Sequence, residues 1–214
     1  MQITLRNFIP HPLVETSHTD SDIWEKEEIV FNSNSTYLVT APSGKGKTSL
    51  ISMIYGIRKD YNGKITLDGA DISLFNLFEW SEFRKKKISC IFQGLELFDE
   101  MTALENIQLK NRILDYKAGF EIMEMARVLE MDTYLTRAAG KLSFGQRQRI
   151  AIIRALCQPF EFLLADEIFS HLDKKLEKLS YDLILQESRK NKAGMLLTSL
   201  HPLEEYTFDI HFMI

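Results

Sequence analysis

The strongest constraint on the fold is a run of small residues that joins an apolar segment to a helical pattern. The apolar segment spans residues 37–40, the small-residue run spans 41–46, and apolar side chains recur afterwards at helical spacing. Gly44 and Gly46 let backbone N–H groups reach phosphate oxygens, because glycine has no side chain and tolerates unusual dihedral angles. The start of the helix adds partial positive charge. This strand, loop and helix predict a phosphate-binding site in an α/β fold.

Two residues at the end of the loop carry most of the expected chemistry. Lys47 is expected to neutralise the β- and γ-phosphates of a nucleotide, and the Thr48 hydroxyl to bind a magnesium ion. Ala41 stands where the pattern G-x-x-x-x-G-K-[ST] begins with glycine, and alanine is tolerated there if its φ is negative. A chance glycine turn before an ordinary helix is the alternative for this motif taken alone. The residues expected to bind the nucleotide are Pro42, Ser43, Gly44, Lys45, Gly46, Lys47, Thr48 and Ser49.

Further apolar runs predict the remaining strands. Runs with polar or helical flanks are typical of strands covered on both faces of a parallel sheet. These runs span residues 37–40, 88–92, 160–165 and 195–199. Shorter runs predict a peripheral antiparallel sheet, with a polar loop over 15–22. They span residues 2–5, 29–31 and 64–67.

The middle of the chain has a different pattern. Residues 94–141 contain no run that resembles a strand, and Thr102 with Glu105 fits a helix-capping box. Apolar residues then fall on one helical face, at Ile122, Met125, Ala126 and Leu129. We therefore expect a single domain over 1–214. Its nucleotide-binding core and β subdomain comprise 1–93 and 142–214, and a helical subdomain comprises 94–141.

Composition excludes several classes of protein. The 26 basic and 30 acidic residues give a net charge of −4, which provides no basic field for nucleic acid, and the basic run at 84–87 is expected to be a solvated helix face. No apolar run approaches the ~20 residues needed to cross a bilayer, and the N-terminus lacks the apolar core of a signal peptide. Cys90 and Cys157 lie in apolar stretches, as free thiols in a reducing cytoplasm do. A role at a membrane therefore requires a partner.

A second motif identifies the family. The sequence Leu142-Ser-Phe-Gly-Gln146, with the helical pattern that follows it, resembles the LSGGQ signature of ABC ATPases, with Phe144 in place of the first glycine. A helix that begins near Gly145 would direct its N-terminal dipole and the Ser143 hydroxyl at a phosphate. The resemblance implies that this happens across a dimer interface. Ser143, Gly145 and Gln146 of one chain would then complete the binding of the ATP held by Lys47 of the other.

Two neighbouring carboxylates follow an apolar run twenty residues after the signature. Asp166 and Glu167 resemble the Walker B aspartate and the catalytic glutamate, which implies that Asp166 holds magnesium through water and that Glu167 is the general base. The alternative is a purely structural role, in which the two carboxylates only cap a strand at the surface. The order of the other motifs disfavours it. Residues 170–173 resemble the D-loop, and Ile168 stands where proline is usual.

Other positions match the family by register. Gln93 matches the Q-loop glutamine, which touches magnesium and water, and His201 matches the switch histidine at the γ-phosphate. An aromatic residue that stacks on adenine is expected near the first strand, but that register holds His11 and Pro12. Four residues could take the aromatic role, and they stay open alternatives: Phe8, His11, His18 and Trp24.

The resemblance covers nearly the whole chain and implies a P-loop NTPase fold, with a mainly parallel core, a peripheral antiparallel β subdomain and an inserted helical subdomain. It implies ATP and Mg²⁺ as cofactors and an ATP-hydrolysing subunit that dimerises head to tail, with an identical or a different ATPase chain. The expected partner is an integral membrane permease that docks near Gln93. No nucleic acid and no direct membrane insertion are expected, and the location is cytoplasmic, at the inner face of the cell membrane. The lipoprotein-release, macrolide-export and cell-division types are the most similar.

Three other functions compete with this one. A nucleotide-gated module that does not hydrolyse ATP would explain Ala41, Phe144 and Ile168, but it has no need of Glu167. A DNA-maintenance ABC ATPase would need a long coiled-coil insertion, for which residues 49–141 leave too little room. The sequence at 191–194 approaches a guanine-reading motif, but its last residue is glycine rather than aspartate, so a turn before a strand is expected there.

Overall fold

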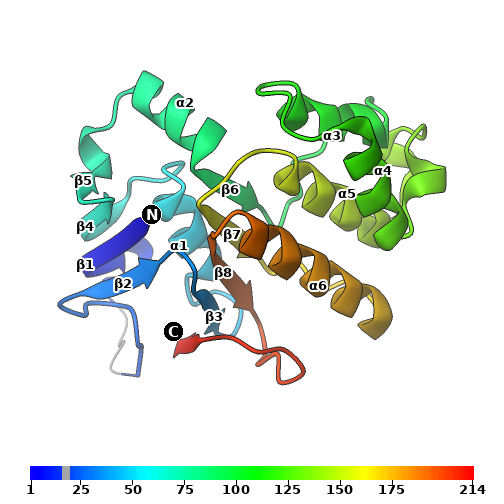
Figure 1. Ribbon diagram of the computed structural model, residues 1–214. Helices are drawn as coiled ribbons and strands as arrows, with labels where there is room; N and C mark the ends of the chain where they lie inside the picture. The colour runs from blue at the N-terminus through cyan, green and yellow to red at the C-terminus, as the bar shows by residue number, and fades with distance from the viewer. Residues whose placement is uncertain (16–19) are drawn as a thin grey trace.

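The computed structural model describes residues 1–15 and 20–214, and its main sheet is wholly parallel (Figure 1). The neighbours in this sheet pair in parallel register throughout. Its order is β6 (Ile88–Ile91), β7 (Phe162–Asp166), β8 (Gly194–Ser199), β3 (Thr36–Thr40) and β9 (Ile210–Met213). The expected strands are therefore present, and each of their predicted boundaries is correct to within two residues.

A second sheet is antiparallel and lies beside the first. Its order is β2 (Ile29–Asn32), β1 (Gln2–Pro10), β4 (Tyr61–Leu67) and β5 (Ala70–Asp71). β1 continues five residues beyond the predicted end, because a bulge between Arg6 and Ile9 absorbs the polar pair that interrupts the apolar pattern. The two sheets and the helices confirm the predicted fold class.

Alternation along the strands builds two cores, one on each face of the parallel sheet. Tyr37 and Val39 pack into one cluster with residues of α1 (Lys47–Ile54), whereas Leu38 between them packs into the other cluster. The second cluster also contains residues of α5 (Phe144–Leu156) and α6 (Lys174–Lys190). Both faces of the sheet are covered, which explains why β7 is apolar up to its final aspartate.

The middle segment is helical, as predicted. It contains α3 (Ala103–Asn111), α4 (Gly119–Val128) and two 3-10 turns, η3 (Asp132–Tyr134) and η4 (Ala139–Lys141). Figure 1 shows α3 and α4 grouped at one end of the molecule, away from the antiparallel sheet. The capping box of Thr102 and Glu105 is formed, and the predicted apolar face of α4 is buried. Within 94–141 the structure has only an isolated β-bridge, between Thr102 and Ala138.

One prediction about surface charge was wrong. Arg84, in α2 (Leu77–Lys86), donates hydrogen bonds to the carbonyl oxygens of Tyr55 and Gly56, and its guanidinium lies over the rings of Tyr55 and Trp80. It is therefore a packing residue rather than part of a solvated face, because its planar cation can stack and donate at once. Lys86 pairs with Glu82 of the same helix, as an exposed residue does.

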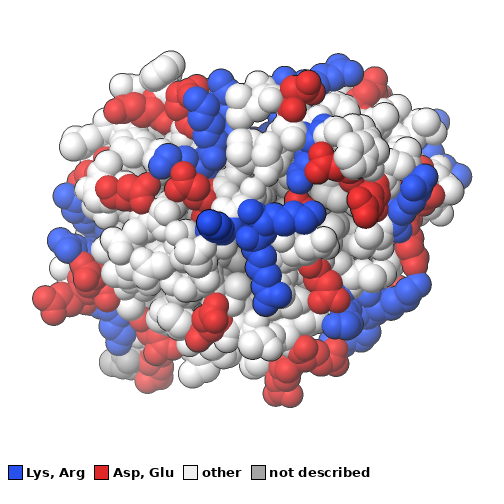
Figure 2. All heavy atoms as spheres, viewed as in Figure 1, with Lys and Arg blue, Asp and Glu red and all other residues white. Residues whose placement is uncertain are grey.

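The prediction of free thiols in apolar surroundings fits the structure, and the viewed face carries charges of both signs. Figure 2 shows Lys and Arg side chains interspersed with Asp and Glu over the face viewed. Cys90 and Cys157 are free, and burial raises the pKa of both thiols, that of Cys157 to about 12.

None of the helices among residues 1–15 and 20–214 is long and apolar enough to cross a membrane. The loop predicted over 15–22 includes residues 16–19, which lie outside the described residues. The remaining 3-10 turns are η1 (His11–Leu13) and η2 (Ile72–Leu74).

Candidate functional site

The loop between β3 and α1 has the geometry that the glycines predict. Gly44 has φ +81° and Gly46 has φ +97°, values that side chains disfavour. A Cβ on Gly46 would also lie 2.9 Å from the ring of Trp24. Ala41 is not among the described residues with positive φ, and its N–H donates to the carbonyl oxygen of Ser199. Alanine therefore fits the first position of the loop without backbone strain.

Lys47 is the first residue of α1, and its side chain turns back into the loop. Its Nζ donates to the carbonyl oxygens of Ala41 at 2.7 Å and Pro42 at 3.0 Å. The same nitrogen lies 3.1 Å from Oε1 of Glu167, and both side chains are largely buried. The Lys47 ammonium thus links the phosphate loop to Glu167, the residue that follows β7.

Glu167 is held on three sides. Gln93 Nε2 donates to its Oε2 at 3.2 Å, on the other side of the carboxylate from Lys47. Its backbone has φ +50°, and its N–H donates to both oxygens of Thr198 at 3.2 Å. A left-handed backbone at a non-glycine residue persists where the surroundings impose it. The structure therefore brings together Lys47, Gln93 and Glu167, which are distant in sequence.

Asp166 is the last residue of β7 and is fully buried. The Thr198 hydroxyl donates to its Oδ1 at 2.6 Å, while Oδ2 has no hydrogen-bond partner among the described residues. Burial raises the pKa of this carboxyl, and the hydroxyls of Thr198 and Thr48 act in the opposite direction. A buried carboxylate oxygen left free beside a threonine hydroxyl fits a hard cation.

A metal ion bound by Thr48 and Asp166 would need its further ligands from a bound phosphate and from water. Among the described residues no group of three or more His, Cys, Asp and Glu side chains could hold a metal ion. Magnesium is commonly bound by one or two protein oxygens together with substrate phosphates and water. The pair Thr48 and Asp166, next to a phosphate-binding loop, fits that mode.

Further predicted residues surround this centre. His201 is exposed and lines a cavity of about 290 Å³ together with Glu167 and Thr198. Pro42 and Lys45 line a neighbouring cavity, and Ser43 and Gly44 are exposed. The Ser49 hydroxyl accepts a hydrogen bond from Arg58 at 2.8 Å, so its side chain is directed at that residue.

The signature residues form the start of α5. Ser143 Oγ accepts from the Gln146 N–H at 3.3 Å, and Gln146 Oε1 accepts from the Ser143 N–H at 3.0 Å, which is a capping box. A Cβ on Gly145 would lie 3.0 Å from the carbonyl oxygen of His171. No hydrogen bond or ion pair between the described residues joins these positions to Lys47 or Glu167. They do not complete the site within one chain.

The candidates for stacking on adenine separate by burial. Phe8 is 0% exposed and Trp24 is 2% exposed, and their rings pack 5.7 Å apart in the core. Neither ring therefore presents a face to solvent. His11 is exposed in η1, and His18 lies outside the described residues.

Sequence reasoning missed Thr198, which holds Asp166 and Glu167 in place through hydrogen bonds. Its hydroxyl contacts Asp166, and both of its oxygens accept from the Glu167 N–H. The signal was present, because Thr198 is a polar residue at the fourth position of an otherwise apolar run at 195–198. A polar residue buried in a central strand has to find a hydrogen-bond partner.

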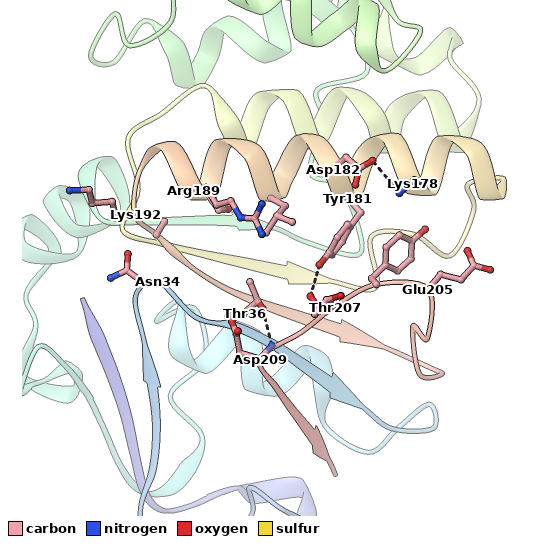
Figure 3. Close-up of a pocket in the computed structure, with 14 residues that line it drawn as sticks. Asn34, Thr36, Lys178, Tyr181, Asp182, Arg189, Lys192, Glu205, Thr207 and Asp209 are labelled. Atoms are coloured by element: carbon pink, nitrogen blue, oxygen red, sulfur yellow. Dashed lines mark hydrogen bonds and ion pairs between the residues drawn. The ribbon is translucent and has the colours of Figure 1, made fainter.

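A separate cavity of about 490 Å³ lies elsewhere (Figure 3). It lies between α6 and the segment at 205–209, where the Tyr181 hydroxyl donates to the carbonyl oxygen of Thr207. Thr36, the first residue of β3, also lines it, whereas the phosphate loop follows the last residue of β3. The two sites are at opposite ends of one strand, and this cavity contains none of the predicted site residues.

Comparisons with known proteins agree with this geometry. A family model described as ABC transporter matches residues 28–170. The lipoprotein-releasing system ATP-binding protein LolD 1 of Chlorobium chlorochromatii is 33% identical over 165 residues, which are 75% of this chain and 67% of that protein. The ABC transporter ATP-binding protein YtrE of Bacillus subtilis is 30% identical over 71% of this chain and 67% of its own length. The dimeric structure of MJ0796, a bacterial ABC transporter cassette, superposes with a TM-score of 0.77 at 24% identity, over 93% of this chain and 88% of that one.

Proposed function

This chain belongs to the ABC transporter family as an ATP-binding and ATP-hydrolysing subunit, and we propose that two ATPase chains close head to tail over two ATP molecules to drive a membrane permease. The observation that carries the proposal is the contact of Lys47 and Gln93 with Glu167, the residue that follows the buried Asp166. The proposed phosphate-binding cation (Lys47), general base (Glu167) and metal-binding carboxylate (Asp166) thus lie next to one another.

Nucleotide binding would change the partners of Lys47. A γ-phosphate that enters the loop carries more charge than Glu167 and would take over the ammonium. The backbone N–H groups of residues 43–49 would bind the remaining phosphate oxygens, with Pro42 contributing no donor, since the loop has the required positive φ values at Gly44 and Gly46. Glu167 would then be left with Gln93 as its remaining side-chain partner.

Thr48 and Asp166 would hold Mg²⁺, and the amide oxygen of Gln93 is the proposed third protein ligand. A magnesium ion held there would supply positive charge that offsets the negative charge developing on the phosphate oxygens during transfer. The raised pKa of Asp166 reflects the cost of its buried charge, and a cation at Oδ2 would offset that cost.

Hydrolysis needs a base and an orienting group. Released from Lys47, the carboxylate of Glu167 would accept a proton from the attacking water, and His201 on the same cavity would contact the γ-phosphate. The N-terminus of α5 in the second chain would close the site, with Ser143, Gly145 and Gln146 at the γ-phosphate. This arrangement is supported by the exposed position of Ser143 at the helix start. Among the described residues, no hydrogen bond or ion pair joins these three residues to Lys47 or Glu167 of their own chain.

We propose that the permease docks in a groove between α2 and α3. The groove is lined by Ile57, Leu77, Trp80 and Ile113, and its described lining also includes four basic side chains and no Asp or Glu. An amphipathic segment with an acidic residue would complement it. Such docking would place the chain at the cytoplasmic face of a membrane, and the similarity to LolD favours a transporter of the lipoprotein-release type.

The two parts of the chain would move against each other in this cycle. We propose that residues 94–141 form a helical subdomain that turns relative to the core formed by 1–93 and 142–214. Gln93 lies at the junction of the two parts and contacts Glu167. Rotation of the subdomain would therefore change the hydrogen bond that Gln93 donates to the proposed base.

The experiment that tests the function is steady-state release of phosphate from ATP by the purified chain with magnesium. Wild-type protein should turn over, and the Glu167→Gln variant should not, while both bind ATP. Equal turnover by the two proteins would remove Glu167 from its role. Binding of ATP by wild-type protein without turnover, with the permease present, would favour a nucleotide-gated module.

A further inference from the structure

An arginine beyond the end of α1 reaches back to the start of that helix. Arg58 follows the last helical residue, Ile54, and its backbone N–H donates to the carbonyl oxygen of Ser52 at 3.3 Å. Its side chain extends from there toward the first turn, where Nη1 donates to Ser49 Oγ at 2.8 Å. Ser49 comes directly after Thr48 in α1. A side chain that is always a cation therefore lies at the first turn of the helix that follows the phosphate loop.

Asp60 fixes the guanidinium on another side. Arg58 Nε donates to Asp60 Oδ1 at 3.0 Å, and Nη2 donates to Oδ2. This two-pronged contact is the geometry in which arginine holds a carboxylate most specifically. The hydrogen bond raises the pKa of Arg58 and lowers that of Asp60, so both groups stay charged. The side chain of Arg58 is nevertheless 36% exposed, which leaves it accessible to a ligand.

The contacts of Arg58 leave hydrogen-bond donors unused. A guanidinium has five N–H groups, and Arg58 uses one on each of its three nitrogens. The second N–H of Nη1 and that of Nη2 have no partner among residues 1–15 and 20–214. The Ser49 hydroxyl accepts from Arg58, so its own proton is free to donate. Arg58 and Ser49 together thus present donors to a ligand that only accepts, such as a phosphate group.

The segment that holds Arg58 also holds η1. The His11 N–H donates to the carbonyl oxygen of Asp60 at 2.9 Å, and His11 is the first residue of η1. The family register places the residue that stacks on adenine at this point of the chain. Lys47, by contrast, contacts Glu167, where the γ-phosphate is expected. Arg58 is therefore tied to the base end of the expected nucleotide, and the phosphate nearest the base is the α-phosphate.

We propose that Arg58 binds the α-phosphate of the nucleotide together with Ser49. Lys47 and Thr48 are engaged by the β- and γ-phosphates and by magnesium, so the α-phosphate meets the next side chain of the helix and the cation beside it. The two aromatic residues considered for adenine stacking are buried, so neither adds affinity at this end of the nucleotide. Arg58 supplies affinity there through charge. The inference rests on the proposed function, because it requires a nucleotide in the phosphate loop.

The test is binding of ADP with magnesium by the purified chain, measured by titration calorimetry. ADP has an α-phosphate and is not hydrolysed at the γ-position. Arg58→Gln should weaken ADP binding roughly tenfold to a hundredfold, the loss expected for a hydrogen bond between charged groups. Arg58→Lys keeps the charge without the planar fork and should recover part of the affinity. Arg6→Gln is the matched control and should bind ADP like wild-type protein, because Arg6 of β1 pairs with the exposed Glu28.

The ³¹P resonances of bound ADP locate the contact, which a merely structural role of Arg58 would not do. At saturating ADP, Arg58→Gln should shift the α-phosphorus resonance and leave the β-phosphorus resonance where wild-type protein has it. Wild-type affinity in Arg58→Gln, or a loss of affinity with the α-phosphorus resonance unchanged, would overturn the inference. Absence of ADP binding by wild-type protein would also overturn it.

Turnover tests the proposed function separately. Wild-type protein that binds ADP but releases no phosphate from ATP, with the permease present, would count against the proposed hydrolysis. The comparison of ADP binding by wild-type protein and Arg58→Gln would still decide the role of Arg58.

Discussion

The ammonium of Lys47 lies 3.1 Å from Oε1 of Glu167, in a largely buried contact. The lysine of the phosphate loop therefore also holds the carboxylate that we propose as the general base. A phosphate that enters the loop competes with Glu167 for a single cation. Binding of ATP would thus release the base in the same step that brings its substrate into place.

The buried charge of Asp166 should lower the stability of the folded protein. Burial raises the pKa of this carboxyl in the folded protein, so its ionised form at pH 7 lowers the free energy of unfolding. Asparagine keeps an oxygen that accepts from Thr198 but has no charge. The Asp166→Asn variant should therefore have a higher Tm at pH 7 without nucleotide, and no magnesium-dependent turnover.

The pH dependence of this gain has a definite sign. A raised folded-state pKa means that the destabilisation appears as pH rises through that pKa. The difference in Tm between Asp166→Asn and wild-type protein should shrink as pH falls toward the ordinary aspartate value of about 3.9. Asp132→Asn, at an exposed aspartate, is the control and should show no such trend. A wild-type protein more stable than Asp166→Asn at pH 7 would contradict the argument.

Thr198→Val should damage both stability and turnover. Valine has the shape of threonine but cannot donate to Asp166 Oδ1, which is now 2.6 Å from the hydroxyl. A buried acceptor left without its partner costs about 1–3 kcal/mol. We expect a loss of that size in denaturant unfolding and a lower kcat. Thr198→Ser, which keeps the hydroxyl, should behave like wild-type protein in both measurements, and equal damage in the two variants would remove the hydroxyl from the explanation.

Ser143→Arg should prevent the two chains from closing. Ser143 is exposed at the start of α5, where a bulky side chain would occupy the place of the partner's γ-phosphate. We expect unchanged ATP binding by the single chain and no ATP-dependent dimer in size-exclusion chromatography. Ser143→Ala removes the helix cap, at a cost of about 1 kcal/mol, without adding bulk. It should still form the dimer, and dimers formed by Ser143→Arg would refute a trans-acting signature.

The sequence predicts the fold well because each strand and helix has its own local signal. Apolar runs covered on both faces locate the parallel strands, and glycines locate the loop before α1. β1 is the exception, since Arg6 and Asn7 interrupt the pattern and only the pairing with β4 shows that the strand continues through a bulge. The role of Arg84 was also missed, because it depends on rings from two other segments.

The candidate site is predicted in part. Motif order identifies Lys47, Asp166 and Glu167 as neighbours, and the structure places them together. The contacts of Thr198 with Asp166 and Glu167 arise from tertiary packing and have no signature in spacing. The adenine position stays open between His11 and His18, because the register near the first strand departs from the family pattern.

The most direct test of the central claim is the nucleotide content of the Glu167→Gln variant after incubation with ATP. Without its base the closed state should persist, since the phosphate loop, the metal-binding residues and the signature are unchanged. We expect a dimer in size-exclusion chromatography that contains two ATP molecules. A monomer that carries one ATP would contradict the proposal that two chains close over their shared nucleotides.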